Sequence, residues 1–119
     1  MTNHNIYLQF TEETLKWSST EGGEYVPVGP GSPTTTVGGT DTITFIAGTG
    51  IDKIQKISDG KNGTKKMLKS KKGEDTGTVV VTIIDKTIKN EIDSYSIKFK
   101  PTSGGSVTVD PDIKGNGAP

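Results

Sequence analysis

The chain has 119 residues, 29% of them hydrophobic, and its 14 basic and 14 acidic side chains give a formal net charge of zero. A chain of this length forms one domain, so we expect a single domain over residues 1–119. The lack of cysteine excludes disulfides and thiolate chemistry, and the lack of arginine removes the side chain best suited to phosphate and guanine. We find no apolar run of membrane-spanning length and no signal-peptide pattern, so the sequence predicts a cytoplasmic protein.

The kinds of apolar residue favour an all-β fold. The chain has twelve Ile and eight Val but three Leu, and its 16 Gly and 6 Pro favour turns. β-Branched side chains fit the pleated surface of a sheet and lose rotamer freedom in a helix. The composition therefore predicts β-sheets joined by Gly- and Pro-rich turns.

In the first half of the chain, alternating apolar residues predict strands at residues 6–10 and around Leu15 and Trp17. Residues 19–39 hold three Pro and six Gly, which predicts a long connection or an edge segment. "TDTITFIAG" (40–48) predicts the next strand. "IDKIQKIS" (51–58) has Ile at every third position, which indicates a strand with a bend or bulge.

In the second half, a short strand is expected around Met67 and Leu68, and "TVVVTII" (78–84) is typical of a central strand. "DKTIKNEID" (85–93) favours one helical turn, since Ile88 and Ile92 are four residues apart. Strands are expected at "YSIKF" (95–99) and "SVTVD" (106–110), and residues 114–119 are expected to form a flexible tail. Seven or eight short strands separated by turns predict a two-sheet sandwich.

The order of these segments resembles that of the cupredoxins. "TDTITFIAGTGIDKI" resembles the strand and turn that carry their first copper-binding histidine, and "YSIKF" followed by "SVTV" resembles their final hairpin. The closing "VDPDI" is similar to small cupredoxin-like proteins, including the bacterial inclusion-body protein family. The resemblance implies a Greek-key sandwich with cupredoxin-like or immunoglobulin-like topology.

The positions that would bind copper do not carry copper ligands. A blue-copper site needs two histidines and a cysteine. By the resemblance, the first histidine position falls near Asp52 and the cysteine position falls on Phe99, while the only histidine, His4, lies in the first predicted strand. We therefore expect no copper, no electron transfer and no other cofactor.

Other candidate sites each have a structural alternative. Asp110, Asp112 and Asn116 form a candidate Ca²⁺ site, for which the alternative is a simple turn after the last strand. Eight lysines and one acid lie between Lys53 and Lys72. They indicate a basic interaction surface or, alternatively, a solvated edge strand that resists aggregation. The lysines proposed for that surface are Lys61, Lys65, Lys66, Lys69, Lys71 and Lys72.

These observations favour a non-enzymatic structural or interaction protein. No nucleophile motif is present, and the adjacent acids at 12–13 and 74–75 fall in predicted turns. The expected partner is a second copy of the chain, paired through edge strands, or an acidic protein. Specific nucleic-acid binding is not expected, because the lysine segment lacks arginine and stacking aromatics. The alternative function is a ligand- or Ca²⁺-binding module that uses loops at one end of the sandwich.

Overall fold

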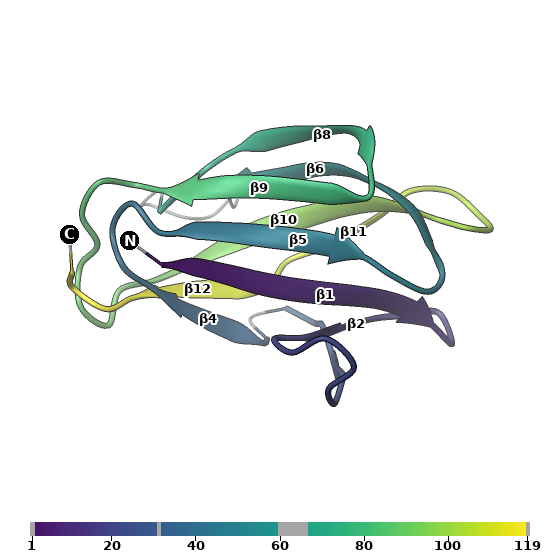
Figure 1. Cartoon of the computed structure of the whole chain (residues 1–119), viewed down its shortest axis with the longest axis horizontal. Coiled ribbons are helices and arrows are strands. Elements are labelled where there is room, and N and C mark those ends of the chain that lie inside the picture. The colour runs from purple at the N-terminus through teal and green to yellow at the C-terminus, as the bar shows by residue number, and fades with distance from the viewer. Residues whose placement is uncertain (1, 31, 60–66, 119) are drawn as a thin grey trace.

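The computed structural model describes residues 2–30, 32–59 and 67–118, and these form an all-β sandwich of two sheets (Figure 1). The predicted fold class is therefore confirmed. The predicted count of seven or eight strands is wrong, since the described residues form twelve strands. The difference arises because some strands are only two residues long, and because residues 68–76 contribute one strand to each sheet.

Sheet 1 contains six strands, and β1 and β5 run parallel within it. Its spatial order is β3 (Val26–Pro27), β2 (Thr14–Ser18), β1 (Asn3–Thr11), β5 (Thr42–Ala47), β9 (Thr78–Ile83) and β7 (Leu68–Lys69).

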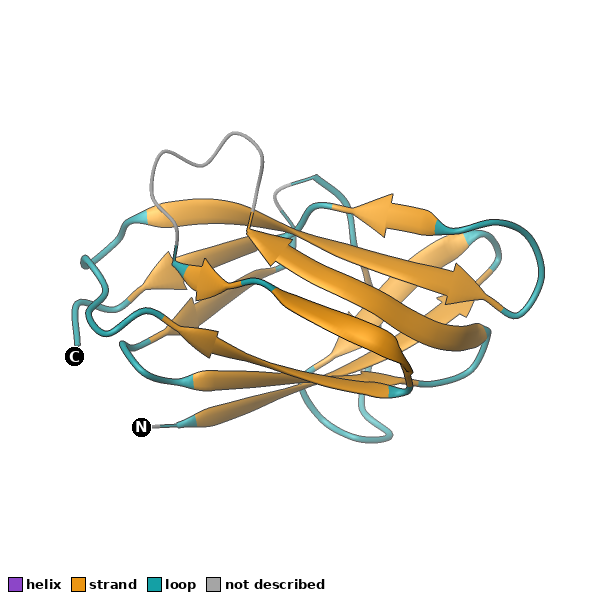
Figure 2. Ribbon diagram, turned by 90° about the horizontal axis from the view of Figure 1, so that it is seen from above, coloured by secondary structure: helices purple, strands orange, loops and turns teal. Residues whose placement is uncertain are grey.

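Sheet 2 has β10 near its centre, and β4 and β12 run parallel at one edge. Its spatial order is β4 (Thr34–Val37), β12 (Asp112–Gly115), β10 (Ile92–Pro101), β6 (Ile51–Asp59) and β8 (Lys71–Thr76). Strand β11 (Val107–Val109) pairs with the second half of β10. Figure 2 shows the two layers from above.

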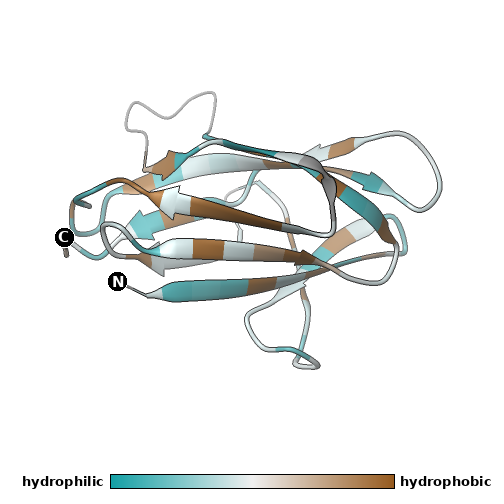
Figure 3. Ribbon diagram, turned by 45° about the horizontal axis from the view of Figure 1, so that its top comes forward, coloured by the Kyte–Doolittle hydropathy of each residue, from teal (hydrophilic) through white to brown (hydrophobic). Residues whose placement is uncertain are grey.

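The core lies between the sheets because apolar side chains alternate along the strands, as the bands of colour in Figure 3 show. Two aromatic contacts cross it. The rings of Phe45 and Tyr95 have centroids 5.9 Å apart, and those of Phe10 and Phe99 are 5.3 Å apart. Such pairs stabilise a core by about 0.5–1.5 kcal/mol beyond their buried area.

The two long sides of the sandwich differ. On one side, β7 pairs with β9 of sheet 1, and β8 pairs with β6 of sheet 2, so a single stretch of chain joins the sheets. On the other side, sheet 1 ends at β3 and sheet 2 ends at β4, and these two strands are not paired with each other. The sandwich is thus joined along one side and open along the other.

One local expectation, a helical turn, needs correction, and the structure adds detail to two others. The described residues contain no helix, and the proposed helical turn at 85–93 is a loop that leads into β10, with Ile88 and Ile92 both exposed. The connection at 19–39 includes the short strands β3 and β4. The segment 114–119, expected to be a flexible tail, begins inside β12, and Asn116 donates its N–H to the carbonyl of Val37 at 2.9 Å.

The turn between β1 and β2 has an unfavourable backbone. Glu12 and Glu13 form the two-residue loop, and both have positive φ angles, of 54° and 61°. Hairpins of this type favour Asn-Gly, because an ordinary side chain in this left-handed region costs about 1–2 kcal/mol. This turn therefore holds strain that the flanking strands must offset.

We predict that Glu12→Asn combined with Glu13→Gly raises the free energy of unfolding by about 1 kcal/mol, because the new residues tolerate positive φ. Chemical denaturation measures the change. The control is Glu21→Asn with Glu24→Gly, which alters the same residue types at exposed positions without positive φ. Equal stabilisation by both pairs would contradict the assignment of strain to this turn.

Candidate functional site

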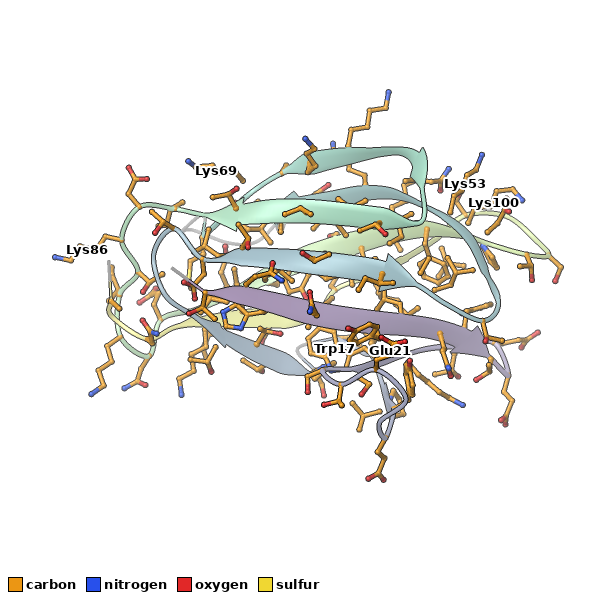
Figure 4. All side chains as sticks on the ribbon, viewed as in Figure 1. Trp17, Glu21, Lys53, Lys69, Lys86 and Lys100 are labelled. Carbon is orange, nitrogen blue, oxygen red and sulfur yellow. The ribbon has the colours of Figure 1, made fainter. Side chains whose placement is uncertain are left out.

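A cleft with a volume of about 380 Å³ lies on the open side of the sandwich, between the first strands of sheet 1 and the edge of sheet 2. Ligand sites commonly begin at about this size. Figure 4 labels Trp17, the single tryptophan of the chain, which lies next to β1. The lining residues are His4, Asn5, Ile6, Trp17, Ser19 and Pro33–Thr36.

The first wall of the cleft is the free edge of β4. The N–H of Asp112 donates to the carbonyl of Pro33, and the N–H of Asn116 donates to that of Val37. In a parallel pair, alternate residues bond to the neighbouring strand. The main-chain groups of Thr34 and Thr36 therefore point away from β12, and the described sheets place no strand on that side.

The second wall is the first half of β1, which β2 does not reach. Strand β2 pairs with residues 7–11 of β1 and ends at Ser18, opposite Tyr7. The N–H of Thr42 donates to the carbonyl of Thr2, so His4 and Ile6 bond to β5, and Asn3 and Asn5 present their main chain to the open side. Two partly free strand edges, one from each sheet, thus border the same cleft.

One end of the cleft is fixed by the buried carboxylate of Asp41. It accepts hydrogen bonds from His4 Nε2 at 2.8 Å, from the Gly38 N–H at 2.8 Å and from the Thr2 N–H at 2.9 Å. Burial raises the pKa of Asp41, but these bonds outweigh burial and hold the pKa below its ordinary value. Asp41 therefore stays ionised and ties β1 to the turn that follows β4.

Two polar groups near β4 have raised pKa values. Burial raises the pKa of the Tyr95 hydroxyl far above its ordinary value, although the neighbouring Thr35 hydroxyl reduces the effect. Burial, together with the charge of Asp93, raises the pKa of Asp112. Because Tyr95 stays protonated, it cannot act as a base at neutral pH.

The proposed Ca²⁺ ligands lie in or next to the last strand, and each has a different neighbour. Asp110 Oδ1 accepts a hydrogen bond from Ser96 Oγ at 2.6 Å, and Asn116 Oδ1 accepts one from the Ala118 N–H at 2.8 Å. Asp112 lies in β12, opposite Ser94 of β10. Within the described part of the chain, no three His, Cys, Asp or Glu side chains are grouped to hold a metal ion. The Ca²⁺ site stays a prediction.

The proposed lysine surface is only partly within the described residues. Lys61, Lys65 and Lys66 lie outside them, whereas the exposed Lys69, Lys71 and Lys72 lie on β7 and β8. The structure adds Lys56 and Lys98, which were not among the proposed lysines. Lys56 on β6 stands opposite Lys72 on β8 and opposite Lys98 on β10. The alternation in "YSIKF" predicts that Lys98 faces outward, and this is the signal that could have found it.

The two positions that the cupredoxin resemblance assigned to copper ligands have different environments. Asp52 is exposed on β6, whereas Phe99 is fully buried in the core. Phe99 contributes to core packing through its contact with Phe10.

The chain matches no protein-family profile and no curated protein sequence. None of its described residues forms a helix long and apolar enough to cross a membrane. The candidate site must therefore be interpreted from its own geometry.

We predict that Asp41→Asn lowers the free energy of unfolding at neutral pH by about 2 kcal/mol, because it weakens hydrogen bonds to a buried charged group. The folded pKa of Asp41 is below the unfolded value, so its contribution is complete above the unfolded value of about 3.9 and is lost as the pH falls through the folded pKa. Thermal melts at pH values from neutral down through the folded pKa should therefore show a smaller acid-induced loss of stability in the variant than in the wild type.

The control for this prediction is Asp52→Asn, which removes an exposed aspartate from β6. It should leave both the neutral-pH stability and the slope in acid close to those of the wild type. An Asp41→Asn protein that keeps the full acid-induced loss would show that Asp41 does not stabilise this end of the cleft.

Proposed function

We propose that this protein is a non-enzymatic interaction protein that associates through the free edge of β4 with the same strand of a second copy. The single observation that carries the proposal is that β4 is an edge strand with neither charge nor proline. Natural proteins usually protect such edges, because an open row of N–H and C=O groups pairs readily with another strand.

The other outer strands of the described sheets are protected. Strand β8 carries Lys71 and Lys72, and β7 is two residues long and includes Lys69. Strand β3 is also two residues long, and one of them is Pro27, which has no N–H to donate. Strand β11 has three residues and is followed directly by Asp110. Strand β4 differs from all of these.

The geometry supports a second copy as the partner. Two β4 strands related by a twofold axis would each offer the main chain of Thr34 and Thr36, and a self-complementary interface of this kind is the commonest in homo-oligomers. The zero net charge of the chain leaves little repulsion between copies. The cleft beside β4 provides room for the added strand, whose side chains would approach Trp17.

We predict weak, reversible self-association, because each strand contributes only four residues. A Kd on the order of 0.1–1 mM corresponds to a binding free energy of about −4 to −5.5 kcal/mol. Sedimentation velocity at increasing protein concentration should show a rising mean mass. The fluorescence of Trp17 should change over the same concentration range, since the only tryptophan lines the cleft.

The test variant is Thr34→Lys with Thr36→Lys, which places charges on two exposed positions of β4 and imitates the protection of β8. We expect it to remain monomeric throughout. The control is Val80→Lys with Thr82→Lys, which adds the same charge to β9, an inner strand of sheet 1. A wild-type mass independent of concentration, or equal loss of association in both variants, would refute pairing through β4.

A further inference from the structure

The outer face of sheet 2 carries a row of lysines across three neighbouring strands. Lys56 of β6 stands directly opposite Lys98 of β10 on one side and Lys72 of β8 on the other. All three are exposed, while the adjacent Ile57 and Ile97 are buried in the core. Successive residues of a strand face opposite ways, so the lysines point outward together.

A second pair extends this lysine face. Lys53 of β6 stands opposite Lys100 of β10, and Figure 4 shows both side chains near the same end of the sandwich. Neighbouring strands lie about 4.8 Å apart, so each lysine has its nearest like charge on the next strand. The sheet, rather than the local sequence, brings these residues together.

This arrangement is unfavourable for the folded protein. Like charges directly opposite each other destabilise a sheet. The ion pairs His4–Asp41 and Lys16–Glu12 lie elsewhere in the molecule and do not include Lys56, Lys72 or Lys98. Protection of the edge strand explains Lys72 alone, and the opposed Lys56 and Lys98 lie on inner strands of the sheet.

The chemistry next to the row suits a carboxylate. Ser58 and Ser96 stand opposite each other in the adjoining row, and Ser96 Oγ already donates a hydrogen bond to the carboxylate of Asp110 at 2.6 Å. The same face therefore binds one carboxylate from within the chain, two residues along β10 from Lys98.

The face is poorly suited to nucleic acid. Proteins that bind single strands combine positive charge with aromatic side chains on which bases stack. The aromatic residues of β10, Tyr95 and Phe99, are fully buried on the opposite face of the sheet. The chain also has no arginine to form paired hydrogen bonds with phosphate or guanine.

We propose that the row of Lys56, Lys72 and Lys98, with Lys53 and Lys100 beside it, is a docking surface for an acidic segment of another protein. Aspartate and glutamate side chains of that segment neutralise the opposed ammonium groups of Lys56, Lys72 and Lys98. Binding thus removes a repulsion that the free protein carries. The proposal is independent of association through β4, which lies at the far edge of the same sheet.

The test replaces the row by Lys56→Gln, Lys72→Gln and Lys98→Gln, with poly-L-glutamate as the probe. Glutamine is somewhat shorter than lysine but stays polar and removes the charge. We expect the affinity for poly-L-glutamate, measured by titration calorimetry at low salt, to fall at least about tenfold. The free variant should also have a higher Tm than the wild type at low salt, because the repulsion is gone.

The matched control is Lys16→Gln, Lys86→Gln and Lys89→Gln, which changes the net charge equally but lies off this face. It should retain affinity within about twofold of the wild type and show no gain in Tm. Equal loss of affinity in both variants would mean that only net charge matters, and would overturn the proposal. A test variant less stable than the wild type would overturn the argument from repulsion.

Two further probes separate the classes of partner. Single-stranded DNA and vesicles containing phosphatidylserine are titrated under the same conditions as poly-L-glutamate. Weaker binding of both supports an acidic protein segment. Tighter binding of either one, lost in the same test variant, would reassign the surface to nucleic acid or to an anionic membrane. Failure of the wild type to bind poly-L-glutamate would also overturn the proposal.

Discussion

The alternation of side chains along β10 is the constraint on which the rest of the molecule depends. Tyr95, Ile97 and Phe99 point inward and are fully buried, and Tyr95 and Phe99 make the two aromatic contacts that link the sheets. The same strand pairs with β6 on one side and with β11 and β12 on the other. A shift of one residue would expose these side chains and bury Lys98, so the register is strongly determined.

This register also determines what the outside of the molecule presents. Because the inward positions are fixed, Lys98 and Lys100 must face outward, where β6 places Lys56 and Lys53 opposite them. The core and the lysine face are therefore two consequences of one alignment. The open side has a different origin, since β2 ends at Ser18 and leaves the first residues of β1 without a neighbour there.

The parts of the structure that could be predicted from the sequence are those with a local signal. Alternation located the strands around Phe45 and Ile97 and assigned their inward faces, because the pattern repeats every two residues. The three-residue spacing of Ile51, Ile54 and Ile57 indicated the irregularity that appears in the pairing of β6. The four-residue spacing of Ile88 and Ile92 led to the wrong prediction of a helical turn. Both side chains are exposed, and helical spacing without burial gives no helix.

The candidate sites depend on which strands are neighbours in the sheets, and no local sequence pattern indicates the order of the strands. Strand β4 pairs with β12, more than seventy residues later, so no neighbouring residue reveals that its other edge is free. Lys56 and Lys98 are likewise far apart in the chain and meet only through the sheet. The bond between His4 and Asp41 joins two segments that have no shared motif.

The stretch that forms both β7 and β8 makes the two long sides of the sandwich unequal in their dynamics. Only Ser70 separates the two strands, and its hydroxyl accepts a hydrogen bond from the Asp59 N–H at 2.9 Å. Detaching this stretch loosens β9 in one sheet and β6 in the other at once. We therefore expect amide protons along that side to exchange with solvent as one cooperative unit, and those of β4 to exchange through smaller, local openings.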